Sequence, residues 1–97
     1  MKNCIRVFRA LSHETRLKIL FYLLDGERCV CDIVKHVGRS QPTISNHLSR
    51  LQKDGILTSK REGQWVYYWI ADERAMGILK TCRAIIEKEG KISEEGR

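Results

Sequence analysis

Apolar residues recur at intervals of three and four over most of the chain, which predicts a mainly α-helical domain. Ile5, Phe8 and Leu11 predict a short first helix that follows an N-terminal arm over residues 1–4. Residues 17–24 show the same spacing, and Ser12 stands where the N-cap of this second helix is expected. The N-terminal part of the chain therefore predicts two consecutive amphipathic helices.

Two more helices with a short turn between them are predicted in the middle of the chain. Val30 to Val37 carries apolar residues at helical intervals and is stopped by Gly38. Ser40 is placed to cap the next helix, and Pro42 lies in its first turn, where a missing N–H is harmless. Two helices joined in this way form a helix-turn-helix. The buried stripe of its second helix is predicted to be Ile44, Leu48 and Leu51.

The pattern then changes to β-branched and aromatic residues, over 56–60 and 65–70. These segments flank Gly63, which suits the positive φ of a tight turn, so they predict a two-stranded hairpin, or wing. The last helix, over residues 72–89, has an apolar surface wider than one domain needs, which predicts dimerisation. The predicted fold is mainly α with a small β-hairpin: a winged helix-turn-helix of five helices and a two-stranded wing that forms a homodimer.

A length of 97 residues fits one small domain over 1–97, with a polar, disordered tail from residue 90 to 97. The chain has no apolar run of about eighteen residues, and Lys2, Arg6 and Arg9 interrupt its N-terminus. This excludes a membrane span and a secretory signal, so a cytoplasmic protein is expected. In a reducing cytosol, clustered cysteines serve metal binding or redox sensing more often than structural disulfides.

The positive charge of the chain is unevenly placed. The formal net charge is +6, and residues 35–61 hold six basic residues and one acidic residue, a local net charge of +5. Phosphate binding requires such a concentration of charge, although a merely solvated basic face would look the same.

The outer face of the second helix of the helix-turn-helix is polar and suited to reading bases. The amides of Gln41 and Asn46 can bond bidentately to adenine, and Arg50 can reach guanine or phosphate. An ordinary exposed helix would instead favour Glu and Lys in i,i+4 pairs. His47 lies beside the apolar stripe and is expected to be packed and hydrogen-bonded. The predicted DNA-contacting residues of the helix and wing are Ser40, Gln41, Thr43, Ser45, Asn46, Ser49, Arg50, Lys53, Lys60, Arg61 and Gln64.

Cys29 and Cys31 stand at the predicted start of the third helix. Side chains two residues apart diverge inside a regular helix, but at a helix start they can approach one ion. Cys29 falls at the N-cap position, and Asp32 stands where a capping box has its acidic residue. The unpaired N–H groups of a helix start stabilise thiolates, which are the metal-binding and oxidisable form. We therefore expect both thiols to be reactive.

Four segments together resemble the ArsR/SmtB family of winged-helix metal-sensing repressors, over roughly residues 5–88: SHETRLKIL, CVCDI, SQPTISNHL and REGQWVYY. The resemblance implies a homodimer that binds double-stranded DNA at an inverted-repeat operator and leaves it when a metal or metalloid binds. Asn46 stands where the family often has His, which bears on the operator sequence. The resemblance places dimerisation in the first and last helices, and the residues expected there are Ile5, Phe8, Met76, Leu79 and Ile86.

The CVCDI segment resembles the thiolate sensors of the family, so the implied effectors are As(III), Sb(III), Cd(II) or Pb(II), with no organic cofactor. Family arsenic sensors often have a third cysteine where this chain has Val34. Cys4 resembles the donors that cadmium and lead sensors bring from the other protomer, and it is the predicted third ligand. Cys82 is the second choice and is otherwise a packed thiol. No zinc site is expected at the start of the last helix, because Arg74 replaces the family's His.

Two alternatives stay open. The first is a redox-sensing repressor whose thiols oxidise and release DNA, in which Cys82 would matter more than Cys4. The second is a non-sensing winged-helix module for DNA binding or protein interaction. An enzyme is not expected, because no base stands near the cysteines and His13, His36 and His47 lack a paired acid.

Overall fold

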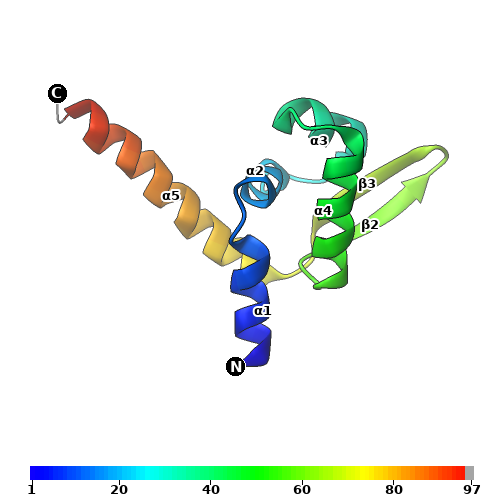
Figure 1. Ribbon diagram of the computed structural model, residues 1–97, viewed down its shortest axis with the longest axis horizontal. Helices are drawn as coiled ribbons and strands as arrows, with labels where there is room; N and C mark the ends of the chain where they lie inside the picture. Colours follow the sequence, from blue (N-terminus) through cyan, green and yellow to red (C-terminus); the bar gives the residue numbers. More distant parts are fainter. Residues whose placement is uncertain (96–97) are drawn as a thin grey trace.

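The computed structural model describes residues 1–95, with side chains described to Glu89, and within this range the chain forms five helices and three strands (Figure 1). Two of the strands form the wing, which projects beside the helix-turn-helix, and the last helix extends away from the rest of the molecule. The elements are α1 (Lys2–Leu11), α2 (Glu14–Leu23), β1 (Arg28–Cys29), α3 (Val30–Val37), α4 (Gln41–Lys53), β2 (Leu57–Glu62), β3 (Trp65–Ile70) and α5 (Glu73–Glu95).

Local capping chemistry fixes the helix-turn-helix, as predicted. Gly38 ends α3 with a φ of 77°, a left-handed conformation that glycine adopts without steric cost. Ser40 then caps α4, because its Oγ accepts a hydrogen bond from the Thr43 N–H at 3.4 Å. Pro42 lies in the first turn of α4. The predicted bounds of α3 and the predicted N-caps Cys29 and Ser40 are all confirmed.

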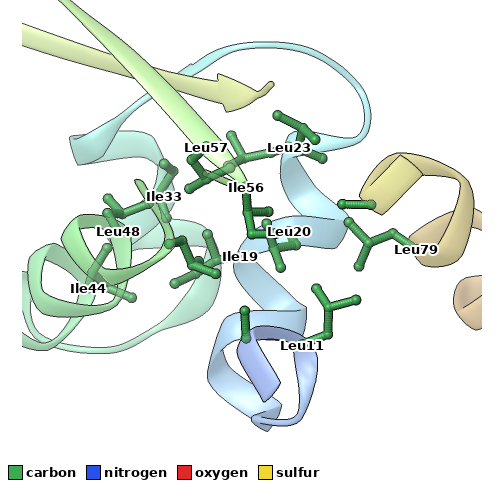
Figure 2. Packing of buried hydrophobic residues seen from close by; sticks show 14 residues of the cluster. Leu11, Ile19, Leu20, Leu23, Ile33, Ile44, Leu48, Ile56, Leu57 and Leu79 are labelled. Atoms are coloured by element: carbon green, nitrogen blue, oxygen red, sulfur yellow. The ribbon is translucent and has the colours of Figure 1, made fainter. Parts of the chain in front are cut away.

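The core lies where the apolar stripes of the helices meet (Figure 2). Ile44 and Leu48 of α4 pack beside Ile33 of α3, and both helices rest on Ile19 and Leu20 of α2. All five side chains are fully buried. Burying one such side chain contributes about 1.5–3 kcal/mol. Helix α4 is therefore held firmly while its opposite face stays free.

The sheet contains a third strand that the sequence pattern did not reveal. Its order is β1-β3-β2 and it is antiparallel, with Arg28 opposite Tyr68 and Cys29 opposite Tyr67. A two-residue strand is too short to show alternation, so periodicity could not predict it. The added strand joins the first cysteine of the pair directly to the wing strand β3.

The wing hairpin itself is close to the prediction. Strand β2 pairs with β3 from Leu57 opposite Ile70 to Glu62 opposite Trp65, and Gly63 in the turn has a φ of 63°. β2 runs to Glu62, two residues further than predicted. The side chains of Tyr68 and Ile70 pack toward the core, whereas Trp65 is 48% exposed.

Three predicted boundaries were wrong, two near the N-terminus and one at the end of the last helix. Helix α1 begins at Lys2, so residues 1–4 form no separate arm, because the Ile5 N–H already donates to the Met1 carbonyl. The N-cap of α2 is His13, whose Nδ1 accepts from the Thr15 N–H at 3.2 Å, while the Ser12 hydroxyl donates back to the Phe8 carbonyl. Sequence alone favours serine over histidine as a cap.

The last helix was predicted to end at Glu89 but continues to Glu95. Gly90 costs a helix only about 1 kcal/mol relative to alanine, which is too little to stop it. The predicted disordered tail therefore begins inside a helix, and its final residues, 96–97, lie outside the described part of the chain. Among residues 1–95, no helix is both long and apolar enough to cross a membrane.

Candidate nucleic-acid interface and cysteine site

The outer face of α4 carries the predicted base-reading residues at the surface. The Ile44, Leu48 and Leu51 side chains are fully buried, and His47 beside them is half-buried against α2. Ser45 is half-buried, and the remaining predicted residues of this helix are exposed: Gln41, Thr43, Asn46, Ser49, Arg50 and Lys53. The helix thus presents short polar side chains near its N-terminus and cations near its C-terminus.

Some predicted contact residues already have partners within the chain. The Ser40 hydroxyl donates to Thr43 Oγ1 at 2.9 Å, so both hydroxyls take part in the N-cap. Arg50, whose side chain is exposed, forms an ion pair at 3.6 Å with the half-buried Asp54. Ion pairs at the protein surface contribute little, and the Arg50 side chain is on the solvent side of this pair, so its guanidinium can exchange the carboxylate for a phosphate.

The predicted DNA-contacting residues of the wing differ in whether they have partners within the chain. Lys60 Nζ lies 3.1 Å from Glu62 and 3.5 Å from Glu27. The hydrogen bond to Glu62, and then the charge of Glu27, raise the pKa of Lys60. Arg61 and Gln64 are exposed near the turn. Lys60 is therefore placed as an anchor of the hairpin, and Arg61 and Gln64 are freer to meet a phosphate.

A polar contact between α2 and α4 was missed by sequence reasoning. Arg16 Nε donates to His47 Nδ1 at 3.2 Å, and the rings of His47 and His13 lie 4.7 Å apart between centroids. His47 is half-buried and hydrogen-bonded, as predicted. Burial, and then the charges of His13, Arg16 and Arg39, lower the pKa of His47. No local signal reveals this contact, because the two partners are 31 positions apart.

Cys29 and Cys31 meet at the start of α3, as the helix-start geometry predicted. Cys29 is the N-cap residue, with an extended backbone that turns its side chain toward Cys31, and the two Cα atoms are 5.4 Å apart. Their Sγ atoms form a disulfide, whereas two thiols were expected. Cys29 is 6% exposed and Cys31 is exposed. The pair is therefore both oxidisable and reachable from one side.

The N-terminus of α3 has no side-chain cap. The predicted capping box is wrong, because no side chain accepts from the first N–H groups of this helix. The Asp32 carboxylate instead lies with the cysteines, and the three ligand atoms are within 4.8 Å of one another. After reduction, two sulfurs and one carboxylate oxygen would face the same point, beside free N–H groups that stabilise thiolates. This donor set suits a soft ion that accepts mixed S and O ligands.

The other two cysteines do not join this cluster within one protomer. Cys4 is exposed near the free end of α1, and that end lies on the opposite side of the molecule from α3 (Figure 1). Cys82 is half-buried on α5, in a groove that Phe8, Leu17 and Ile85 also line. A third sulfur from Cys4 could therefore reach the pair only from a second copy of the chain.

Tyr22 is stacked between Arg28, the residue before Cys29, and His36. The Arg28 guanidinium lies 4.5 Å from the centroid of the Tyr22 ring. The His36 ring is parallel to the Tyr22 ring within 8°, at 3.8 Å between centroids. Arg28 belongs to β1 and His36 to the last turn of α3, so these contacts link β1, α2 and the end of α3. Cation–π contacts of this kind contribute about 0.5–2 kcal/mol.

The start of α5 carries an internal ion pair. Asp72 accepts hydrogen bonds from the Arg74 N–H at 2.9 Å and from Arg74 Nε at 3.2 Å. The side chain of Arg74, ahead of the backbone donors, lowers the pKa of Asp72. Its carboxylate is thus occupied by a cation of the chain itself, and the expectation of no zinc site here stays a prediction.

An apolar surface runs over α1 and α5. Phe8 and Ile85 are each 53% exposed, and Ile5 and Ile86 are each 47% exposed. Between the two helices lies a groove of about 650 Å³. Leu79, one of the predicted dimerisation residues, is fully buried in the core, because it faces α2 (Figure 2). Met76 is half-buried against the core, and Ile85 is an exposed residue that the prediction omitted.

Comparison with known proteins agrees with this architecture. Residues 13–59 match the family of bacterial regulatory proteins described as the arsR family. A helix-turn-helix transcriptional regulator of Methanocaldococcus jannaschii is 44% identical over 80 residues, which are 81% of this chain and 90% of the relative. The arsenical resistance operon repressor of Escherichia coli is 45% identical over 65 residues, which are 66% of this chain but only 56% of that repressor.

Solved structures show the same fold. The homodimeric winged helix-turn-helix DNA-binding domain of a Mycobacterium bovis regulator superposes with a TM-score of 0.80 at 32% identity. The superposition covers 91% of this chain and 82% of that domain. The family match, the Methanocaldococcus jannaschii relative and the Mycobacterium bovis domain all agree with the helix-turn-helix and wing seen here. The chain therefore belongs to the ArsR family of transcriptional regulators.

Proposed function

We propose that this protein is a homodimeric repressor that binds an inverted-repeat operator and is released by a thiophilic metal or metalloid ion bound at Cys29 and Cys31. One observation carries the proposal. The cysteine pair begins α3 and at the same time pairs with the wing through β1. The effector site is therefore joined directly to the wing, and it reaches the recognition helix α4 through α3, which packs against α4.

The packing provides a route from the ion to the recognition helix. Ile33 of α3 is fully buried beside Ile44 and Leu48 of α4 (Figure 2). An ion that draws the Cys29 and Cys31 sulfurs into its own coordination geometry moves the start of α3, and tightly packed side chains transmit such a shift. A coupling of about 1–3 kcal/mol would weaken operator binding by about 5- to 150-fold.

The ligand set is two thiolates with one further donor. Cys4 of a second protomer supplies a third sulfur, and Asp32 is the nearest oxygen within the same protomer. As(III) and Sb(III) favour three sulfurs, while Cd(II) also accepts a carboxylate. The exposed side chains of Phe8, Ile85 and Ile86 support the dimer that the Cys4 ligand needs.

The proposal is tested by measuring operator binding with labelled DNA under anaerobic, reducing conditions. As(III) or Cd(II) should lower the affinity of the wild type for the operator and leave the operator affinity of Cys29→Ser unchanged. Absorption from sulfur-to-metal charge transfer, titrated in parallel, counts the ions per dimer. The metal-release proposal would be refuted if As(III), Sb(III), Cd(II) and Pb(II) all left the operator affinity unchanged.

The disulfide favours a second candidate function, a redox-sensing repressor. A hydroperoxide would oxidise the two thiols: each thiol loses a proton and an electron, one S–S bond forms, and the peroxide becomes water and an alcohol. In this structure Cys31 is the partner of Cys29, so oxidation would not need Cys82, contrary to the sequence-based expectation. The test compares operator affinity of the oxidised and reduced protein without metal, with Cys31→Ser as the control.

A further inference from the structure

A group of basic side chains lies where α2 meets the recognition helix. Arg16 Nε donates to His47 Nδ1 at 3.2 Å, and the His13 ring is 4.7 Å from the His47 ring between centroids. Arg39 is exposed in the turn between α3 and α4. Among the side chains described, which end at residue 89, no ion pair uses either arginine. We call His13, Arg16, Arg39 and His47 the α2–α4 basic cluster.

The positive charges of the basic cluster are not compensated within the described part of the chain. Burial, and then the charges of His13, Arg16 and Arg39, lower the pKa of His47, and no acidic group is among the causes. Like charges held together raise the free energy of the group, and an anion placed among them lowers it. The partner that suits this cluster is therefore an anion from another molecule.

The hydrogen bond to His47 leaves most of the Arg16 guanidinium available. A guanidinium carries five N–H donors in one plane, and the bond from Nε uses only one of them. Among the described residues, the Arg16 Nη atoms have no hydrogen-bond partner. The half-buried Arg16 side chain is thus held at Nε with a fork of free donors. Such a fork binds two oxygens of a phosphate at once.

The basic cluster lies on one flank of the face that is predicted to read DNA. His47 follows the predicted contact residue Thr43 by one helical turn, and Arg39 directly precedes Ser40, the N-cap of α4. When the outer face of a recognition helix enters the major groove, its flanks approach the phosphates that border the groove. The anion nearest to the basic cluster in the DNA complex is therefore a backbone phosphate.

We propose that Arg16 and Arg39 together bind one backbone phosphate of the DNA, and that His47 positions Arg16 for this contact. The proposal rests on the DNA binding in the proposed function, and it adds a contact outside the predicted set, which is confined to residues 40–64. The two arginines touch the phosphate, whereas His47 acts only through Arg16. Because a phosphate carries no sequence information, the contact strengthens binding to any duplex.

The salt dependence of DNA binding tests this contact. The affinity of the reduced, metal-free protein for operator and for random-sequence duplex is measured by fluorescence anisotropy over a range of KCl concentrations. Each neutralised phosphate contributes about 0.9 to the slope of log affinity against log salt. The Arg16→Gln/Arg39→Gln double variant should lower this slope by about 1 per protomer, because one phosphate contact is lost. Lys18→Gln, which removes an exposed cation of α2 already paired with Glu14, should leave the slope unchanged.

The single variants should weaken both duplexes by the same factor, about tenfold for Arg16→Gln, as expected for a hydrogen bond to a charged group. Arg39→Gln tests the site independently of the fold, because Arg39 is an exposed turn residue. Gln41→Ala is the contrasting control, since a base-reading residue should weaken operator binding more than random-duplex binding. Urea unfolding confirms that each variant is folded under the assay conditions.

The positioning role of His47 is tested by two replacements. His47→Gln keeps a side-chain oxygen that can accept from Arg16 and should retain DNA affinity, whereas His47→Ala loses the acceptor and should weaken both duplexes. Arg16→Gln should then cost less affinity in the His47→Ala background than in the wild type, because His47 acts through Arg16. Equal losses in the two backgrounds would overturn the positioning role.

The remaining outcomes separate the sources of phosphate and the two proposals. An unchanged salt slope in the double variant overturns the phosphate contact. Inorganic phosphate, titrated without DNA and followed by the NMR signals of His47, tests a free anion as the occupant: saturable binding together with an unchanged slope would assign the cluster to that anion. If metal ions fail to release DNA while the slope falls as expected, the phosphate contact stands and the metal-release function fails.

Discussion

Arg16 Nε donates a hydrogen bond to His47 Nδ1 at 3.2 Å and so joins α2 to the recognition helix α4. The accepting Nδ1 carries no proton, so a neutral His47 keeps its proton on Nε2. The apolar stripe of α4 fixes how deeply that helix packs, but apolar contacts are not directional. The Arg16–His47 bond adds a directional constraint beside the face that is predicted to read DNA.

Removing either partner of this bond should destabilise the fold in a coupled way. A double-mutant cycle with Arg16→Ala and His47→Ala should give a coupling free energy of about 1 kcal/mol, the usual net contribution of a hydrogen bond. Urea unfolding monitored by circular dichroism measures it. Lys18→Ala, which loses only the exposed ion pair with Glu14, is the control on the same helix. Strictly additive effects would show that the bond contributes nothing.

Acid should destabilise the protein through His47. The pKa of His47 in the folded state lies below the ordinary value of 6.5, first because of burial and then because of His13, Arg16 and Arg39. The unfolded chain therefore binds protons more readily, so stability is full above about pH 6.5 and falls as pH drops from there toward the folded pKa. Urea midpoints measured across this window should fall with pH less steeply in His47→Gln than in the wild type. Identical pH profiles would rule out His47 as the cause.

Neighbouring substitutions on α4 should separate stability from DNA binding. Leu48 is fully buried, so Leu48→Ala should lower the free energy of unfolding by about 2–5 kcal/mol. Ser49 is exposed, so Ser49→Ala should leave stability within about 0.5 kcal/mol of the wild type and weaken operator binding. Urea unfolding and fluorescence anisotropy measure the two effects. Normal operator affinity in Ser49→Ala would remove that residue from the predicted DNA-contacting set.

The sequence predicted those parts of the fold that local chemistry decides. The end of α3 and the cap of α4 follow from Gly38 and Ser40, each of which acts on its immediate neighbours. The missed features depend on tertiary contacts. Strand β1 exists only because Arg28 and Cys29 lie beside β3, and the partner of His47 is 31 positions away. The same limit applies to the candidate site, where sequence could place the cysteines at the start of α3 but not their link to the wing through β1.

The apolar surface of α1 and α5 should hold the dimer. Phe8→Glu and Ile85→Glu each place a charge on a residue that is 53% exposed, so they should shift the protein toward the monomer without unfolding it. Sedimentation velocity measures the change. Trp65→Glu, at a side chain of similar exposure on the wing, is the matched control and should leave the dimer intact. A dimer that survives both substitutions would place the interface elsewhere.

If Cys4 is a ligand, its contribution should depend on that dimer. The end of α1 that carries Cys4 lies across the molecule from α3, so its sulfur can reach Cys29 and Cys31 only from another protomer. Cys4→Ser should therefore reduce Cd(II) affinity in the wild-type background, and Cys82→Ser, at the half-buried thiol, should not. In the Ile85→Glu background Cys4→Ser should have no further effect, because the monomer has already lost the third sulfur. Charge-transfer absorption during anaerobic titration reports each affinity. A Cys4→Ser effect of equal size in dimer and monomer would contradict a site shared between protomers, and loss of the metal signal in Cys82→Ser would instead make Cys82 the third ligand.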